Sequence, residues 1–114
     1  MGIKTEEAVV KMIFHGGNTR KEAFNAIDAA EKYDFASAEA HLQSGLVEYQ
    51  SGHSWQVKLV SQRETENTAP SFLLIHGQDH LMTAHTELNL AKKLVKVYER
   101  EAALVKRIEQ LEKK

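Results

Sequence analysis

An apolar seam with alternating spacings of three and four residues runs unbroken from position 74 to position 105, and it constrains the fold more than any other feature. Because an α-helix has 3.6 residues per turn, this spacing places every member on one helical face. The seam therefore predicts one long helix that other helices must cover. We expect it to open at Thr68 or Ala69, since Pro70 is harmless in a first turn. The seam comprises Leu74, Gly77, Leu81, Ala84, Leu88, Ala91, Val95, Tyr98, Ala102 and Val105.

The sequence outside this seam also favours helices over strands. No segment shows the alternating, β-branched pattern of a sheet strand. Proline occurs once, and aromatic residues make up 7% of the chain. An all-α fold follows, and the 114 residues fit a single domain that spans positions 1–114.

A first helix is expected to start at Thr5, whose hydroxyl can cap free backbone N–H groups. Gly16 and Gly17 interrupt its apolar face, and two glycines predict a kink or a break there. One interpretation is a turn between two short helices, and the other is a bend that lets a neighbouring backbone approach closely. The face comprises Val9, Met12, Ile13, Ala23, Ile27 and Ala30.

A second helix is expected after a tight connection at Lys32–Asp34, with Asp34 as its cap. Its seam fades at residues 63–67, which we interpret as a solvated loop. Three such helices predict an antiparallel three-helix bundle with a kinked first helix and a long third helix. The second seam comprises Phe35, Ala38, Leu42, Gly45, Tyr49, Gly52, Gln56 and Leu59.

A second apolar stripe lies beside the seam of the third helix, and one antiparallel neighbour cannot cover both. We therefore favour homo-oligomerisation through this helix, because stacked helices are the available cover. A monomer with a frayed end at residues 106–114 is the alternative. The stripe comprises Leu90, Leu94, Val97, Leu104, Ile108 and Leu111.

The overall charge and the residue counts exclude several classes of protein. With 15 Lys and Arg against 16 Asp and Glu, the chain has no basic field for nucleic acid. The absence of cysteine excludes a disulfide framework, thiolate metal sites and thiol catalysis. No apolar run reaches the roughly 20 residues that cross a bilayer, so we expect no membrane insertion. The N-terminus lacks the apolar core of a signal peptide, and we expect a cytoplasmic protein.

Three ionisable residues interrupt the apolar start of the third helix. His76, Asp79 and His80 fall within an arc of about 100° on one face. A neutral imidazole is a good nucleophile toward phosphorus, so phosphoryl transfer is one interpretation. Metal binding is another, because histidines at i and i+4 can share an ion, with Asp79 and His53 as further ligands. The third is that polar side chains are tolerated at a surface or an interface. The pattern alone leaves these three open.

The string from His76 to Thr83, HGQDHLMT, resembles the signature HAQDHLMT of the lactose/cellobiose-type IIA components of the bacterial sugar phosphotransferase system (PTS). The resemblance extends over roughly residues 5–98. Other matches follow in the same order as in that family: Gly17 with Arg20, Tyr33-Asp34-Phe35 with Ala38-Glu39, and Gly52-His53 with Gln56.

The resemblance implies a phosphocarrier that assembles as a compact homotrimer of three-helix bundles. The phosphohistidine of the carrier protein HPr would donate to His76, which would phosphorylate a cysteine of the IIB component. IIB in turn serves the membrane porter IIC. His80 is implied as a supporting residue, and Gln78, His53 and Gln56 are candidate active-site neighbours.

The resemblance also implies a metal site at Asp79, which would meet its copies on the trimer axis around a structural divalent cation. We expect Mg²⁺, with one ion per trimer. Three carboxylates that met there without a cation would repel one another strongly.

The sequence departs from the family pattern at Val57, where Thr is usual, at Gly77, where Ala is commoner, and in the loop at residues 63–68. The altered loop bears on which sugar branch and which IIB partner the protein serves. It does not contain the residues that carry phosphotransfer. It leaves an alternative function open, a non-catalytic helical interaction or metal-binding bundle that retains the fold. His15 has no assigned role, and we expect it to be exposed.

Overall fold

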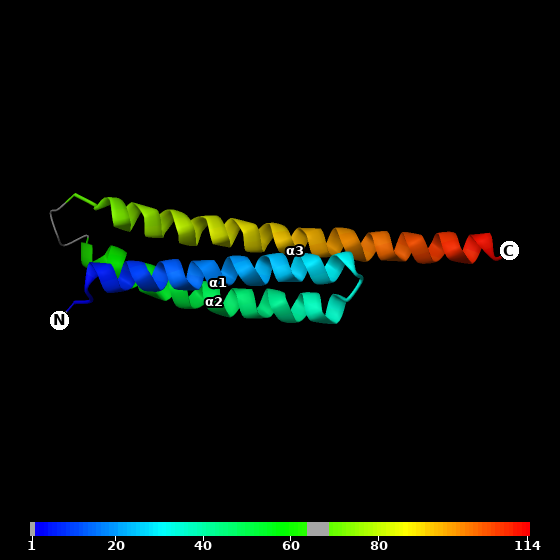
Figure 1. Cartoon of the computed structure of the whole chain (residues 1–114), viewed down its shortest axis with the longest axis horizontal. Coiled ribbons are helices and arrows are strands. Elements are labelled where there is room, and N and C mark those ends of the chain that lie inside the picture. The colour runs from blue at the N-terminus through cyan, green and yellow to red at the C-terminus, as the bar shows by residue number, and fades with distance from the viewer. Residues whose placement is uncertain (1, 64–68) are drawn as a thin grey trace.

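The computed structural model describes residues 2–63 and 69–114. Within these ranges the chain forms three helices and no strand: α1 (Thr5–Glu31), α2 (Phe35–Arg63) and α3 (Phe72–Glu112). The chain reverses direction at each connection, so α1 and α3 run parallel to each other and antiparallel to α2 (Figure 1). The prediction of an all-α three-helix bundle is confirmed.

Helix α1 packs against both of the other helices, whereas α2 and α3 contact each other much less. The molecule is a rod of 72 × 19 × 17 Å, and the C-terminal part of α3 projects beyond the ends of α1 and α2 (Figure 1). Every residue from position 103 onward is exposed. None of the helices in the described ranges combines the length and the apolar character that a bilayer crossing requires.

The buried seam of α3 confirms the predicted long helix, since its members from Leu74 to Val95 are all buried. Tyr98 and Ala102 are half-buried, and Val105 is exposed. The core has two parts. An alanine-rich cluster surrounds Leu88, and a cluster of larger side chains surrounds the start of α3: Ala8, Val9, Met12, Leu59, Leu74 and Leu81.

The predicted interruption of the first helix is wrong, because α1 is continuous through Gly16 and Gly17 and Figure 1 shows no sharp kink there. The close approach of a neighbouring backbone is confirmed for Gly16, but without the bend that was expected to allow it. A Cβ at this position would lie 3.4 Å from the backbone of His80 and Leu81, so the missing side chain lets α1 and α3 meet closely. This packing offsets the helix propensity cost, about 1 kcal/mol per glycine.

The predicted start of the first helix at Thr5 is confirmed, but its capping role is wrong, because Lys4 is the N-cap and makes no side-chain hydrogen bond. Helix α3 starts later than expected, because Ser71 is its N-cap and accepts a hydrogen bond from the Leu74 N–H at 3.1 Å. Pro70 therefore precedes the helix. Thr68 and most of the predicted loop at residues 63–67 lie outside the described residues.

The predicted cap of α2 is confirmed. The carboxylate of Asp34 accepts hydrogen bonds from the Ser37 backbone N–H at 3.2 Å and from the Ser37 hydroxyl at 2.8 Å. Both bonds lower the pKa of Asp34, and the bond from the Ser37 hydroxyl has the larger effect.

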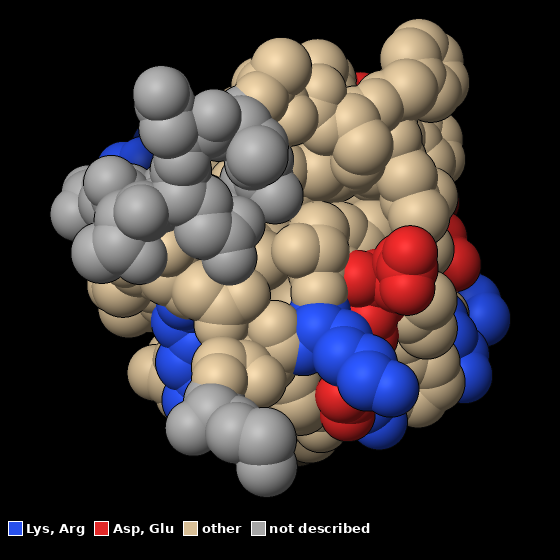
Figure 2. Space-filling view, turned by 90° about the vertical axis from the view of Figure 1, so that its left-hand side faces the viewer, with Lys and Arg blue, Asp and Glu red and all other residues tan. Residues whose placement is uncertain are grey.

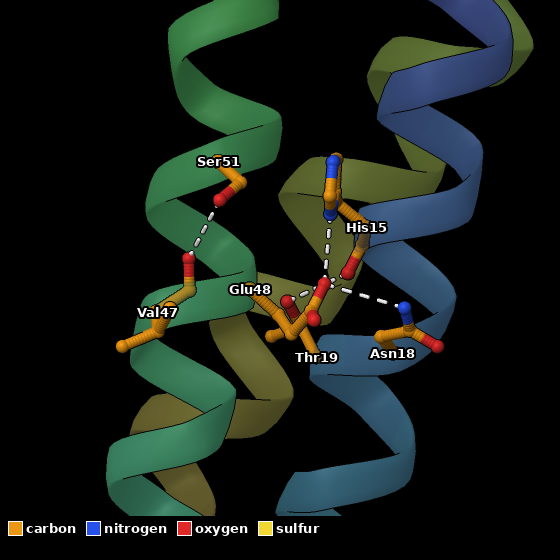
Figure 3. Close-up of polar contacts among 6 residues, drawn as sticks. All are labelled: His15, Asn18, Thr19, Val47, Glu48 and Ser51. Atoms are coloured by element: carbon orange, nitrogen blue, oxygen red, sulfur yellow. Dashed lines mark hydrogen bonds and ion pairs between the residues drawn. The ribbon is translucent and has the colours of Figure 1, made fainter.

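His15 is half-buried between α1 and α2, so the prediction of an exposed position is wrong. Its Nδ1 lies 2.7 Å from a carboxylate oxygen of Glu48, which also accepts a hydrogen bond from Asn18 (Figure 3). Gly52 faces the Cβ of His15 across the helix interface. The contact joins residues far apart in the sequence, which explains why spacing alone did not reveal it.

Truncation of the fully buried Leu88 tests the core. We expect Leu88→Ala to lower the free energy of unfolding by about 2–5 kcal/mol, through lost burial and the cavity left behind. The matched control is Val47→Ala, whose side chain is 60% exposed and whose effect should stay within about 0.5 kcal/mol. Thermal and urea unfolding, followed by circular dichroism, measure the stability of both variants. Equal losses of stability would contradict the placement of Leu88 in the core.

The Asp34 cap predicts a pH dependence. The pKa of Asp34 is lowered in the folded protein. The ionised cap therefore stabilises the fold at pH values above 3.8, the ordinary pKa of this carboxyl group. That contribution is lost as the pH falls through the lowered value. The difference in melting temperature between wild type and Asp34→Ala should therefore shrink in acid. Asp34→Asn, with an acceptor that does not titrate, should show a smaller loss at neutral pH. A constant wild-type advantage over Asp34→Ala down to about pH 2 would argue against this role.

Candidate functional site

His76 is exposed near the start of α3, on a segment that the core holds in place. Leu74, Gly77 and Leu81 on the same turns are buried. Gly77 packs so closely that a Cβ there would lie 2.8 Å from Cγ1 of Val9. The imidazole is therefore presented to solvent from a rigid helical scaffold.

A second imidazole lies beside the first. The rings of His76 and His80 meet edge to face, with centroids 4.6 Å apart and planes at 80°. His80 is half-buried, next to the close contact between Gly16 and the α3 backbone. The spacing of one helical turn that the sequence indicated brings these two rings into contact.

Asp79 is exposed, and its carboxylate lies 3.5 Å from the hydroxyl of Thr83. Asp79 and His80 border a small pocket of about 120 Å³ between α1 and α3. The pocket also contains an ion pair in which Arg20 Nε lies 3.0 Å from a carboxylate oxygen of Glu87. Sequence analysis assigned no role to Thr83 or Glu87. Both residues lie on the same face of α3 as His76, and this helical spacing could have identified them from the sequence.

Gln56 and Gln78 meet across the bundle. The amide of Gln56 on α2 donates a hydrogen bond to the side-chain oxygen of Gln78, and it lies 3.6 Å from the sulfur of Met82. Residues two positions apart on a helix do not face each other, so Gln78 points away from His76 of the same chain. These two amides connect α2 to the start of α3.

His53 is exposed on α2, and its ring stacks on Tyr49 at 5.5 Å rather than on the His76–His80 pair. Tyr49 also stacks on His85 of α3, with centroids 4.0 Å apart, a contact that sequence reasoning missed. Burial raises the pKa of Tyr49. Among the described residues, no group of three His, Cys, Asp or Glu side chains could hold a metal ion. Within one chain, the histidines and Asp79 thus form no metal centre.

Exposed apolar side chains surround His76 along the start of α3. Phe72 is 86% exposed, and Leu73, Ile75 and Met82 are also exposed. Viewed onto this end of the bundle, the uncharged surface gathers at the top, on the side of α3, with charged side chains below it (Figure 2). An accessible imidazole within an apolar surface has the chemistry that group transfer to and from another macromolecule needs.

Comparisons with known proteins agree with this chemistry. Residues 7–99 match the family model described as the PTS system, lactose/cellobiose specific IIA subunit. The chain is 35% identical to the lichenan-specific phosphotransferase enzyme IIA component of Bacillus subtilis, covering 88% of this chain and 92% of that protein.

Solved structures agree as well. The PTS cellobiose-specific enzyme IIA of Bacillus anthracis superposes with a TM-score of 0.82 at 32% identity, covering 90% of this chain and 95% of that one. The chitobiose IIA of Escherichia coli, solved in complex with HPr, superposes with a TM-score of 0.69 at 28% identity, covering 89% and 99%. The resemblance carried by HGQDHLMT is confirmed: the chain belongs to the lactose/cellobiose-specific IIA family of the bacterial sugar phosphotransferase system.

Proposed function

We propose that His76 is the residue on which this IIA component carries its phosphoryl group. As a PTS IIA component the chain is a phosphocarrier, and phosphohistidine chemistry needs an accessible imidazole. The observation that carries the assignment is that His76 is exposed on a rigid segment and in contact with a second histidine. The relative solved with HPr supports phospho-HPr as the donor.

The transfer needs one nitrogen of neutral His76. This nitrogen attacks the phosphorus of the donor phosphohistidine, and the donor P–N bond breaks as the new P–N bond forms. In the second transfer a cysteine thiolate of IIB attacks the same phosphorus, the bond to His76 breaks, and the imidazole is neutral again. His80 lies where its ring can orient His76 and donate a hydrogen bond to a phosphoryl oxygen.

The apolar surface formed by Phe72, Leu73, Ile75 and Met82 supports a docking role toward HPr and IIB. Both complexes have to be transient, because a carrier must leave one partner before it meets the next. In this proposal the whole chain is one IIA domain that works in the cytoplasm and reaches the IIC porter only through IIB.

We further propose a homotrimer with Asp79 on its axis. Asp79 and Leu90 are separated by about three helical turns, so both lie on the face of α3 that the bundle leaves exposed. One chain supplies one exposed carboxylate there, and three copies would supply three. Carboxylate oxygens are ligands that Mg²⁺ prefers, so Asp79 fits a structural cation that would hold the subunits together.

Phosphorylation tests the assignment of His76. Incubation with enzyme I, HPr and phosphoenolpyruvate should give an acid-labile label that is lost in His76→Ala and kept in His53→Ala. His80→Ala should retain a label but acquire it about 10²–10⁴-fold more slowly, if the ring assists transfer. A label that persists at full level in His76→Ala would overturn the assignment.

Light scattering tests the assembly. The protein with Mg²⁺ should have the mass of three chains, and chelation should lower its melting temperature. Asp79→Asn should abolish the effect of chelation, whereas Asp28→Asn, an exposed substitution on α1, should leave it intact. A monomer in the presence of Mg²⁺ would rule out the trimer.

A further inference from the structure

A polar groove between α1 and α2 lies apart from the site described above. Its volume is about 520 Å³, which is within the range of small-molecule sites. In the part of the chain that the structure describes, all of its lining side chains come from α1 and α2. Neither His76 nor the face of α3 proposed for the trimer therefore contributes to this groove.

Two histidine–glutamate contacts hold the carboxylates of the groove in place. Nδ1 of His15 lies 2.7 Å from a carboxylate oxygen of Glu48, which also accepts a hydrogen bond from Asn18 at 3.3 Å (Figure 3). Nδ1 of His41 on α2 lies 2.8 Å from a carboxylate oxygen of Glu22 on α1. The two contacts thus cross between the antiparallel helices in opposite directions, and both carboxylates are fixed before a ligand arrives.

These carboxylates are also partly shielded from water. The side chains of Glu22 and Glu48 are 19% and 32% exposed. Each histidine contact uses one oxygen of its carboxylate and leaves the other oxygen for a ligand. The two histidine contacts are seven positions apart on each helix, so the two acceptors are spread over about two helical turns of the groove.

Close helix packing supports the groove from the inside. A Cβ at Gly45 would lie 2.9 Å from Cδ1 of Leu88 and 3.3 Å from Cβ of Glu22, so α2 approaches both other helices closely at this level. Thr19 is fully buried, and its hydroxyl donates a hydrogen bond to the backbone oxygen of His15 at 2.8 Å. Because both walls are fixed by this packing, a ligand would have to order little of the protein on binding.

The lining offers donors and acceptors together, and it carries charges of both signs. The amides of Asn18 and Gln43 and the hydroxyl of Ser44 can donate and accept, whereas the ammonium of Lys21 can only donate. An anion would meet two carboxylates, and a polyamine would meet that ammonium. A neutral ligand with many hydroxyls avoids both penalties, because each hydroxyl also donates and accepts. Val47, which is 60% exposed, gives the C–H groups of such a ligand an apolar contact.

We propose that the groove between α1 and α2 binds a neutral saccharide of one or two rings. Glu22 and Glu48 accept hydrogen bonds from its hydroxyls, and Asn18, Gln43 and Ser44 pair with the remaining ones. This binding site goes beyond the phosphocarrier function proposed above and does not depend on it.

Nuclear magnetic resonance of the ¹⁵N-labelled protein tests the site, with cellobiose as a neutral disaccharide probe. Cellobiose should cause saturable shifts of backbone amide signals at residues 18–22 and 43–48. The absence of a saturable shift near the solubility limit of this sugar would refute the proposal. Shifts of the same signals by putrescine but not by cellobiose would also refute it, because the groove would then select amines.

Substitutions in the wall of the groove test its location. Gln43 and Ser44 are exposed, so the double variant Gln43→Ala/Ser44→Ala should fold normally and bind cellobiose about tenfold more weakly. The matched control is Gln50→Ala/Ser54→Ala, which changes two exposed positions of α2 that do not line the groove. The control should bind like the wild type. Equal dissociation constants for both double variants would place the sugar elsewhere.

Salt dependence tests the neutrality of the ligand. The affinity for cellobiose should change by less than about twofold between about 50 and 500 mM NaCl, because screening acts only on charged partners. A steep loss of affinity over this range would contradict recognition through neutral hydroxyls.

A further variant separates this inference from the proposed function. His76→Ala should bind cellobiose with the wild-type affinity although it takes up no label from phospho-HPr. Normal labelling of a wild-type protein that does not bind cellobiose would contradict the saccharide site alone. Cellobiose binding that is lost in His76→Ala would contradict its separation from the phosphocarrier site.

Discussion

The close packing of α1 against α3 is the contact on which the rest of the structure depends. Gly16 removes a side chain where α1 meets the backbone of His80 and Leu81, and Gly77 does the same against Val9. Two helices that approach this closely bury a continuous apolar seam and restrict rotation of α3 about its axis. The direction in which every other residue of α3 points follows from that restriction.

That fixed rotation divides α3 into faces with separate roles. The face with Leu74, Leu81 and Leu88 is buried against the bundle, and His76 and Asp79 lie outside it. In the proposed transfer, an imidazole on a helix held by core packing needs little reorganisation. The contact between the His76 and His80 rings depends on the same rigidity, because a frayed first turn would separate them.

The polar contacts between the helices add specificity that apolar packing alone does not provide. Glu48 holds His15 and Asn18 between α1 and α2, and Gln56 holds Gln78 between α2 and α3. Each contact has a partner that only one alignment of the helices supplies, so a shift by one turn would leave half-buried polar groups unpaired.

The sequence by itself determined the helical class, the long third helix, the Asp34 cap and the segment that carries His76, because these follow from local spacing and local hydrogen bonding. The tertiary structure decided the rest. Continuity of α1 through Gly16 depends on a neighbouring backbone. The half-buried position of His15 depends on Glu48, and the place of Gln78 depends on Gln56. These partners are distant in the sequence, and periodicity within one helix carries no information on which residues face each other across two.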